Sequence, residues 1–331
     1  MKSETRDDDP PVRPLRLAGI DIGTLTCRLL IADVRRGGGL KELCSERRIL
    51  RLGEGVDQTK RLAGAAMDRV VRCLVEWRDI VGRFQVDAAI AVATSAVRDA
   101  DNRDVFVSRV KKEAGFDIEV IPGEEEARCT LLGIRSGLPA GVTDILALDI
   151  GGGSTEFILD QPGRPPIVRS IEIGVVRLSE RLLRHDPPTD DEVRHAREWV
   201  AQETKAAVAD MKSETATFVG TAGTITSLAA MAQKLPVYEP AKIHHYRLRL
   251  DAIRELEHTL LGRTKAARIG LPGLEPNREE VIAAGAVIIR TIMETLRQKE
   301  CLVSDRGLRE GVLIHLAARG QSDSGGLISH A

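Results

Sequence analysis

The sequence predicts an α/β protein built from two related domains that face a shared cleft, and three observations support this prediction. The chain has 331 residues, which is more than one hydrophobic core usually serves, so two domains are expected. The segments GIDIGTLTCRLLIADV, at 19–34, and ALDIGGGSTEFILDQPG, at 147–163, repeat one pattern of strand, aspartate, glycine turn and strand. After each segment, strands and helices begin to alternate, which is the order of α/β folds.

The first half is predicted to contain three strands followed by alternating helices and strands. Two strands lie over 17–34, separated by the DIGT turn, and GGG at 37–39 is the next chain reversal before a third strand at 41–52. Apolar residues from Ala63 to Val81 recur at steps of four and three, which predicts a helix. The continuous apolar run at 86–94 is typical of a strand that is buried on both faces. The remaining elements are a helix at about 103–114, a short strand at IEVIP and a helix that begins with GEEEAR.

The same order begins again after a switch that we place near residues 130–140. TDILALDIGGGSTEFIL and VRSIEIGVVRLS supply the strands, and Thr189 with Glu192 fits a capping box at the start of the next helix. We therefore expect a disordered polar extension at 1–16, a first domain at 17–132 and a second domain at 133–307. The helix predicted at about 308–320 can pack back on the first domain.

Charge and cysteine content exclude several classes of function. The 48 basic and 49 acidic residues nearly cancel, so no overall field attracts nucleic acid or an anionic membrane. Five cysteines without a C-x-x-C pair argue against a disulfide framework and a structural zinc site. The chain shows neither a signal peptide nor an apolar run of membrane-spanning length. We expect a cytoplasmic protein without nucleic-acid or membrane partners, and a homodimer remains open.

The glycine turns suggest an anionic ligand. A glycine turn after a buried strand lets backbone N–H groups approach an anion, because no Cβ intervenes and the turn can adopt positive φ. Phosphate is the obvious candidate, since Gly151–Gly153 are followed by the hydroxyl groups of Ser154 and Thr155. The alternative is a tight hairpin without a ligand. It stays open for the DIGT turn, which has one glycine instead of three. Three consecutive glycines cost about 1 kcal/mol each, which favours function for the second turn.

Aspartates at the ends of the two buried strands suggest a cation. Asp21 and Asp149 are costly to bury without a cation or a hydrogen-bond donor. Mg²⁺ prefers one or two carboxylates together with water and phosphate oxygens, which fits two aspartates. An aspartate that accepts hydrogen bonds from its own turn is the alternative.

The acidic run in GEEEAR has two interpretations. Glu124, Glu125 and Glu126 occupy the first turn of the predicted helix, where the helix dipole favours negative charge, and composition alone favours this capping role. One glutamate directed into the cleft would instead orient or deprotonate a water that attacks phosphorus.

Two further strand ends carry polar residues. GTAGTITS, at 220–227, offers a helix N-terminus to another anionic group or to a nucleotide, although such turns are common. ATSAVRDADN places Thr94, Ser95 and Arg98 at a strand end, and arginine suits bidentate contact with phosphate. Arg98 can equally pair with Asp99 or Asp101 on the surface.

Together these motifs resemble one family. In order, DIGTLTCRLLIADV, ATSAVRDADN, IPGEEEARCTLLGI, LDIGGGSTEFIL, GTAGTITSLAAM and GLREGVL resemble the exopolyphosphatase and guanosine pentaphosphate phosphatase (Ppx/GppA) family, from about residue 17 to 318. The resemblance implies two duplicated ribonuclease H-like domains of the actin-like ATPase superfamily around an interdomain cleft. It also implies a Mg²⁺-dependent phosphohydrolase that releases terminal orthophosphate from inorganic polyphosphate or guanosine pentaphosphate. The chain ends at residue 331, which resembles the short, two-domain form of the family.

The resemblance also implies roles for particular residues. Glu126 corresponds to the catalytic glutamate, and Asp149 and Glu156 correspond to the carboxylates that hold Mg²⁺, with Glu156 also counted as catalytic. Leu25 departs from the family, which commonly has asparagine in the first turn, so an amide that could contact phosphate is missing. The phosphate contacts that the resemblance implies are Thr24, Arg28, Arg98, Gly151, Gly152, Gly153, Ser154 and Thr155. The strand-end motifs described above add Asp21, Gly23, Thr94, Ser95, Gly220, Thr221, Gly223 and Thr224 as phosphate-binding candidates.

Two other functions remain open at this point. A kinase of the same superfamily would transfer phosphate from ATP, with GTAGTITS holding the adenosine. A non-catalytic sensor would bind guanosine tetraphosphate or pentaphosphate and signal to a partner, which the substitution at Leu25 would permit. The sequence does not rank polyphosphate against guanosine pentaphosphate, because both present the same terminal anion.

Overall fold

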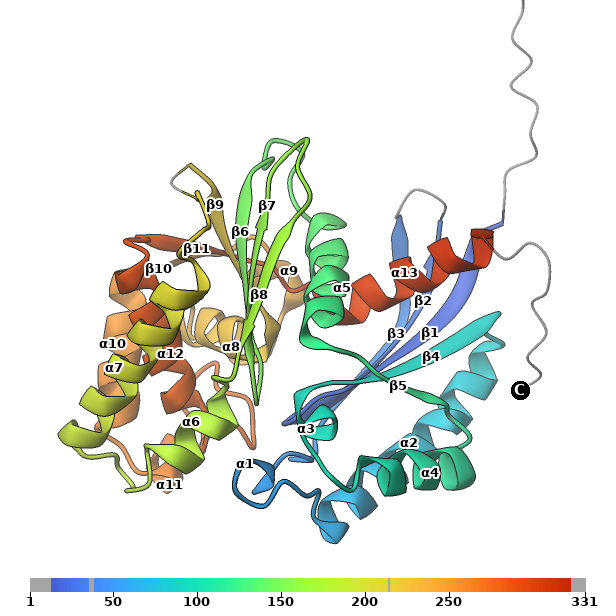
Figure 1. The fold of residues 1–331 in the computed structure, drawn as a ribbon, viewed down its shortest axis with the longest axis horizontal. Helices are drawn as coiled ribbons and strands as arrows, with labels where there is room; N and C mark the ends of the chain where they lie inside the picture. Colours follow the sequence, from blue (N-terminus) through green and yellow to red (C-terminus); the bar gives the residue numbers. More distant parts are fainter. Residues whose placement is uncertain (1–12, 36–38, 214, 323–331) are drawn as a thin grey trace, which may run out of the picture.

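The computed structural model describes residues 13–35, 39–213 and 215–322 of the chain. Two mixed sheets form the molecule, and helices lie outside and between them (Figure 1). Most of the extension expected at 1–16, and most of the reversal expected at 37–39, lies outside the described residues. The first strand begins at Leu15, two residues before the predicted start.

The first sheet has the strand order β3-β2-β1-β4-β5. Its antiparallel part consists of β1 (Leu15–Ile22), β2 (Thr26–Val34) and β3 (Leu40–Ile49), and its parallel part adds β4 (Ala88–Ala93) and β5 (Ile118–Val120). One face packs against α2 (Gly64–Phe84) and α4 (Arg103–Ala114), where Trp77 and Phe106 are completely buried. Two short helices, α1 (Val56–Thr59) and α3 (Ser95–Arg98), lie at the end of the sheet that faces the second domain.

The second sheet has the strand order β10-β11-β9-β6-β7-β8. Its strands are β6 (Ile145–Ile150), β7 (Thr155–Asp160), β8 (Ile167–Ile171), β9 (Thr217–Thr221), β10 (Arg247–Arg249) and β11 (Glu300–Val303). Read from β8, the order β8-β7-β6-β9-β11 repeats β3-β2-β1-β4-β5, with the same parallel and antiparallel pairs. β10 is an added antiparallel edge strand. This repetition confirms the predicted fold class of two duplicated ribonuclease H-like α/β domains.

Helices of the second domain pack around its largest apolar cluster. The predicted capping box is present, since the Thr189 hydroxyl accepts from Glu192 N and the Glu192 carboxylate accepts from Thr189 N. These helices are α6 (Val175–Arg181), α7 (Asp190–Ala207), α8 (Ala222–Ala232), α9 (Pro240–Ile243), α10 (Leu250–Leu261), α11 (Lys265–Arg268) and α12 (Ile282–Thr295). Within the described residues, none of the helices combines the length and apolar content that a membrane crossing requires.

Two helices are exchanged between the domains. The first is α5 (Gly123–Arg135), which follows the last strand of the first sheet but packs with Leu131 and Ile134 on the second sheet. The second is α13 (Leu308–Ser322), which follows the last strand of the second sheet but packs with Leu313 on the first. The predicted domain boundary at 132/133 therefore lies inside α5.

The exchanged helices lie against each other between the two sheets (Figure 1). They approach closely because glycine occupies the contact points on both. A Cβ added at Gly133 would overlap the Gly307 carbonyl, and one added at Gly311 would overlap the Cys129 carbonyl. The crossing thus leaves no space for a larger residue at Gly133 or Gly311.

Candidate active site

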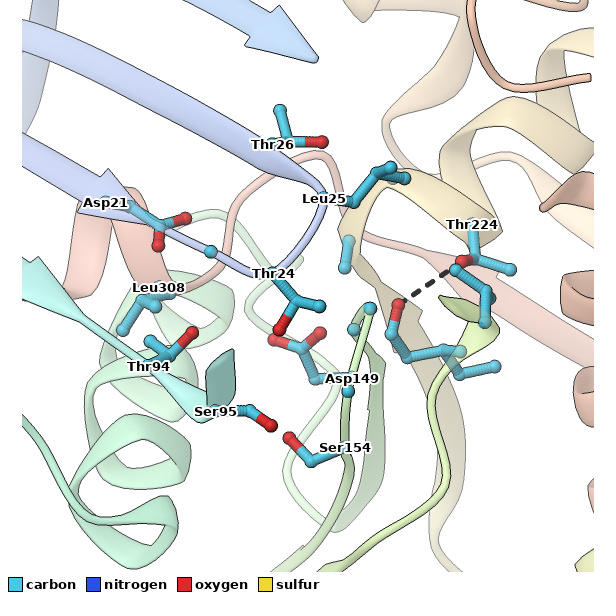
Figure 2. Close-up of a pocket in the computed structure, with 18 of the residues that line it drawn as sticks. Asp21, Thr24, Leu25, Thr26, Thr94, Ser95, Asp149, Ser154, Thr224 and Leu308 are labelled. Carbon is cyan, nitrogen blue, oxygen red and sulfur yellow. Dashed lines mark hydrogen bonds between the residues drawn. The ribbon is translucent and has the colours of Figure 1, made fainter. Parts of the chain in front are cut away.

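One pocket receives residues from both glycine turns, from the ends of β4 and β9, and from the starts of α5 and α13. Figure 2 shows Thr24 beside Asp149, and Thr94 and Ser95 on the side of the pocket opposite Thr224. The predicted residues that line it are Asp21, Gly23, Thr24, Arg28, Thr94, Ser95, Glu126, Asp149, Gly151, Gly152, Gly153, Ser154, Thr221, Gly223 and Thr224. The predicted residues outside its lining are Arg98, Thr155, Glu156 and Gly220.

The first turn directs its carbonyls away from the pocket. The Thr24 carbonyl accepts from Gly53 N at 2.8 Å, and the Leu25 carbonyl accepts from Leu50 N and Arg51 N at 2.9 Å each. Within the described residues, the N–H groups of Thr24 and Leu25 have no hydrogen-bond acceptor. Buried N–H groups are nearly always paired, so these two donors suit an anionic ligand in the pocket.

The second turn has the same arrangement. The carbonyls of Gly151 and Gly152 accept from Val175 N at 3.1 Å and Val176 N at 2.9 Å, at the start of α6. In the part of the chain that the structure describes, the N–H groups of Gly152 and Gly153 meet no acceptor. Both domains thus present unpaired amides to one pocket.

The glycines of the second turn are required by close packing rather than by positive φ. None of Gly151–Gly153 has a positive φ, which differs from the expectation for this turn. A Cβ at Gly152 would lie 2.7 Å from Thr24 Cβ, and one at Gly153 would overlap Ser95 Oγ. The second turn therefore touches the first domain directly, and the two domains are closed on each other in this structure.

Four carboxylates lie in or behind the pocket: Glu126, Asp149 and Glu156 are buried, and Asp21 is half-buried. Burial raises the pKa of Asp21 to about 6, and nearby Arg28 opposes this shift. Burial raises the pKa of Asp149, with Arg28 and a hydrogen bond from Thr130 opposing. Burial and the neighbouring Asp149 raise the pKa of Glu156 to about 8. Negative charge at this place is therefore poorly compensated by the protein alone.

Glu156 lies behind the pocket, next to Asp149 on the adjacent strand. Its Oε1 accepts from Ser170 Oγ at 2.8 Å, whereas its Oε2 is buried without a partner among the described residues. Thr130 donates to Asp149 Oδ2 at 3.2 Å. In the described ranges, no three side chains of His, Cys, Asp or Glu are placed to bind a metal.

These observations fit a Mg²⁺ ion that is held by Asp149 and Glu156 and completed by water and phosphate oxygens. The orphaned Glu156 oxygen and the raised pKa values of the carboxyl groups are what a divalent cation would relieve. Mg²⁺ needs no third carboxylate, because it usually retains several waters and binds substrate phosphates.

Glu126 differs from the other two acids of its helix turn. Glu124 is exposed and Glu125 is half-buried, whereas only 9% of Glu126 is exposed and it lines the pocket. Burial, followed by repulsion from Glu156 and Asp149, raises the pKa of Glu126 well above its ordinary value. Dipole capping does not require this burial, so the position of Glu126 favours a role in the pocket.

Arg98 holds Glu126 rather than lining the pocket. Its Nη1 donates to Glu126 Oε2 at 3.3 Å and to the Ile121 carbonyl at 3.0 Å. Neither of the surface partners considered above, Asp99 or Asp101, forms an ion pair with it among the described residues. Arg98 therefore supports the candidate base.

Thr155 and Gly220 have structural contacts. The Thr155 hydroxyl donates to the Ile173 carbonyl at 2.5 Å, and a Cβ at Gly220 would lie 2.6 Å from Cys301 Sγ. These residues support the second turn and β9 from behind.

Two of the lining residues that were not predicted as part of a site have unusual features, Ala222 and Arg278. Ala222 begins α8 with φ of 68°, a left-handed conformation that is uncommon for alanine and frequent at functional sites. Arg278 is 3% exposed, its Nη2 has no partner in the described part of the chain, and it packs on Gly223. Burial, followed by repulsion from Arg28, lowers the pKa of Arg278 to about 10. No local pattern marks Arg278, because it precedes α12 in an irregular segment. The other lining residues without a predicted role are Leu25, Thr26, Ile150, Val175, Gly307 and Leu308.

The duplicated sheet order and the shared pocket define a two-domain α/β protein of the ribonuclease H-like class. A sequence model of the Ppx/GppA phosphatase family matches residues 30–319. Exopolyphosphatase 2 of Mycobacterium tuberculosis is 38% identical over 317 residues, which cover 91% of this chain and 98% of the relative. Exopolyphosphatase 1 of Mycobacterium bovis is 31% identical over 302 residues, which cover 91% and 88%.

Solved structures agree with these relatives. The crystal structure of the Ppx/GppA family member of Aquifex aeolicus has a TM-score of 0.78 and 34% identity, covering 92% of this chain and 98% of that chain. An exopolyphosphatase from Cytophaga hutchinsonii has a TM-score of 0.84 and 30% identity, with the same coverage. The chain belongs to the Ppx/GppA phosphatase family, as the motifs indicated.

Proposed function

We propose that the protein hydrolyses the terminal phosphoanhydride bond of inorganic polyphosphate or guanosine pentaphosphate and releases orthophosphate. The observation that carries the proposal is that unpaired amides from both domains face one pocket that also contains buried carboxylates. The names of the mycobacterial relatives, both exopolyphosphatases, support the same reaction.

The two turns would bind the terminal phosphates. Amide N–H groups fixed by their neighbouring carbonyl contacts require no reorganisation when negative charge develops on phosphate oxygens. Arg28 and Arg278 would add positive charge at the same pocket.

Glu126 would act on the attacking water. Its carboxylate would accept a proton from water while the water oxygen bonds to the terminal phosphorus and the bridging P–O bond breaks in line. Arg98 would orient this carboxylate and favour its charged form against burial.

Asp149 and Glu156 would hold Mg²⁺, which when bound supplies positive charge to the phosphate oxygens. The Thr130 hydroxyl would orient Asp149, and the Ser170 hydroxyl would orient Glu156.

Orthophosphate release from both substrates, with and without Mg²⁺, tests the proposal. We expect Glu126→Gln to lose about 100- to 10,000-fold in kcat. Glu124→Gln is a matched control on the same helix turn, and we expect it to retain wild-type activity because its side chain is exposed. Equal activity of Glu126→Gln and wild type would remove the assigned base. ATP consumption that requires an acceptor, without orthophosphate release, would replace the hydrolase by a kinase.

A further inference from the structure

Arg177 is a buried charge at the interface of the two domains, outside the pocket described above. It lies on α6, and only 7% of its side chain is exposed. In Figure 1, α6 lies next to α1 of the first domain. A buried guanidinium is costly unless each of its donors has a partner, so its contacts define its role.

The Arg177 guanidinium binds the second turn and the first domain at the same time. Its Nε donates to the Gly153 carbonyl at 2.8 Å. Its Nη1 donates to Asp57 Oδ1 at 2.5 Å, on α1, and its Nη2 donates to Asp99 Oδ2 at 2.7 Å, directly after α3. Glu172, which precedes α6, lies 2.5 Å from Nη2.

Through these contacts, Arg177 connects Gly153 of the second turn to α3 of the first domain. Asp99 is the C-cap of α3, the short helix that also carries Ser95. Ser95 in turn touches the second turn, because a Cβ at Gly153 would overlap its Oγ. Gly153 is therefore fixed to α3 both by direct packing and through Arg177.

We infer that Arg177 is a positioning residue, which aligns the second glycine turn with the first domain when the two domains are closed. The planar fork of arginine can meet the Gly153 carbonyl and the three surrounding carboxylates at once, whereas a lysine ammonium lacks this fixed geometry. This inference rests on the proposed function, in which the amides of the second turn bind phosphate.

Arg181 provides a matched comparison one helical turn further along α6. It also binds Asp57 across the interface, with Nη2 at 2.6 Å from Oδ1. Its side chain is 40% exposed, and its guanidinium also lies over the Trp199 ring rather than on the second turn. Loss of Arg181 weakens the interface without releasing Gly153.

Three variants of the full chain test whether Arg177 aligns the second turn or only forms an ion pair between the domains. They are Arg177→Met, Arg177→Lys and Arg181→Met. We expect Arg177→Met to lower kcat for orthophosphate release about 100-fold with little change in KM, because misalignment mainly affects the transition state. Arg177→Lys should recover part of this loss. Arg181→Met should stay within about fivefold of wild type, as expected for a partly exposed ion pair.

Amide hydrogen exchange measured on the ligand-free protein gives a readout that needs no turnover. The N–H groups of Val175 and Val176 donate to Gly151 and Gly152, so their exchange reports whether the second turn is held. We expect faster exchange in a peptide containing these residues for Arg177→Met and unchanged exchange for Arg181→Met. If Arg177→Met does not fold, Asp99→Ala removes the acceptor of Arg177 Nη2 and should lower kcat about tenfold.

Equal effects of the two methionine variants on both kcat and exchange would overturn the inference, since Arg177 would then be an ordinary ion pair. Absence of orthophosphate release by the wild type would instead refute the proposed function. The exchange comparison would still decide whether Arg177 holds the second turn.

Discussion

The turn after β1 and the turn after β6 share one hydrogen-bond arrangement but differ in the residue opposite their aspartate. In both, the segment after the third strand of the domain binds the turn carbonyls, which leaves amides for the pocket. Asp21 pairs across its hairpin with Arg28, whereas Asp149 pairs across its hairpin with Glu156. The wall of the pocket formed by the first hairpin therefore carries its own positive charge, on Arg28. The wall formed by the second hairpin, with Asp149 and Glu156, carries two acids that suit a cation. The two turns share one backbone arrangement, but the residue opposite the aspartate differs. Arg28 suits direct binding of an anion, whereas Glu156 suits binding through a cation.

Among changes to the two hairpins, the largest effect should come from removing the acid of the second hairpin. Glu156→Gln keeps the size of the side chain but removes a carboxylate proposed to hold Mg²⁺. We expect orthophosphate release to fall about 100- to 1,000-fold and the residual activity to lose its response to Mg²⁺. Ser170→Ala, which removes only a hydrogen bond to Glu156, is the control and should lose far less. Unchanged Mg²⁺ dependence in Glu156→Gln would contradict the assignment of this wall to the cation.

Removing the arginine of the first hairpin, Arg28, should instead weaken the binding of the phosphate substrate. Arg28→Gln is expected to raise KM about tenfold, since a charge-assisted contact to phosphate is lost. Its Mg²⁺ dependence should match wild type. Steady-state kinetics at several Mg²⁺ concentrations measure both quantities, and a shifted Mg²⁺ requirement would erase the difference between the two walls.

Alanine in the two turns should affect stability to different extents. A Cβ at Gly153 would overlap Ser95 Oγ, so we expect Gly153→Ala to lower the free energy of unfolding by about 1–3 kcal/mol. Gly23→Ala should cost less, because its Cβ would lie 3.0 Å from the nearest atom, the Thr26 carbonyl oxygen. Urea unfolding of both variants tests this order. Ser95→Ala combined with Gly153→Ala should recover part of the loss, and absence of recovery would argue against this steric cause.

The smallest effect concerns pH. Burial raises the pKa of Asp21 to about 6 and that of Glu156 to about 8, above the values expected in the unfolded chain. Such groups stabilise the folded state fully below their unfolded pKa, and this contribution is lost as the pH rises through the folded pKa. We expect the melting temperature of the Mg²⁺-free protein to fall as the pH rises from about 4, near the unfolded pKa values, to about 8, the folded pKa of Glu156, and Mg²⁺ to reduce the fall. Calorimetry in EDTA and in Mg²⁺ measures this, and a melting temperature that rises over this range would contradict it.

The sheets and most of the pocket could be predicted because their signals are local. The repeated strand, aspartate and glycine turn fixed β1–β2 and β6–β7, and polar residues at strand ends indicated Thr94 and Thr221. From the sequence we expected α13 to pack back on the first domain, but not that α5 packs on the second sheet, since an apolar helix stripe fits either sheet and the choice depends on tertiary packing. The expected boundary inside α5 follows from this.

The contact partners of several side chains could not be predicted from the sequence either. Arg98 was expected at phosphate or at a surface aspartate, and the structure pairs it with Glu126, which is distant in the chain. Arg278 reaches the pocket from an irregular segment without any motif. The steric need for Gly152 and Gly153 depends on Thr24 and Ser95 across the interface, which no local pattern reveals.

The exchange of α5 and α13 has a consequence for how the chain can be divided. A fragment that ends after α5 would expose Leu131 and Ile134 to water and would lack the helix that covers Leu17. The complementary fragment would have the same defect at Leu313. Each duplicated unit is therefore completed by a helix from the other, so we expect either fragment, produced alone, to expose apolar surface that the whole chain buries.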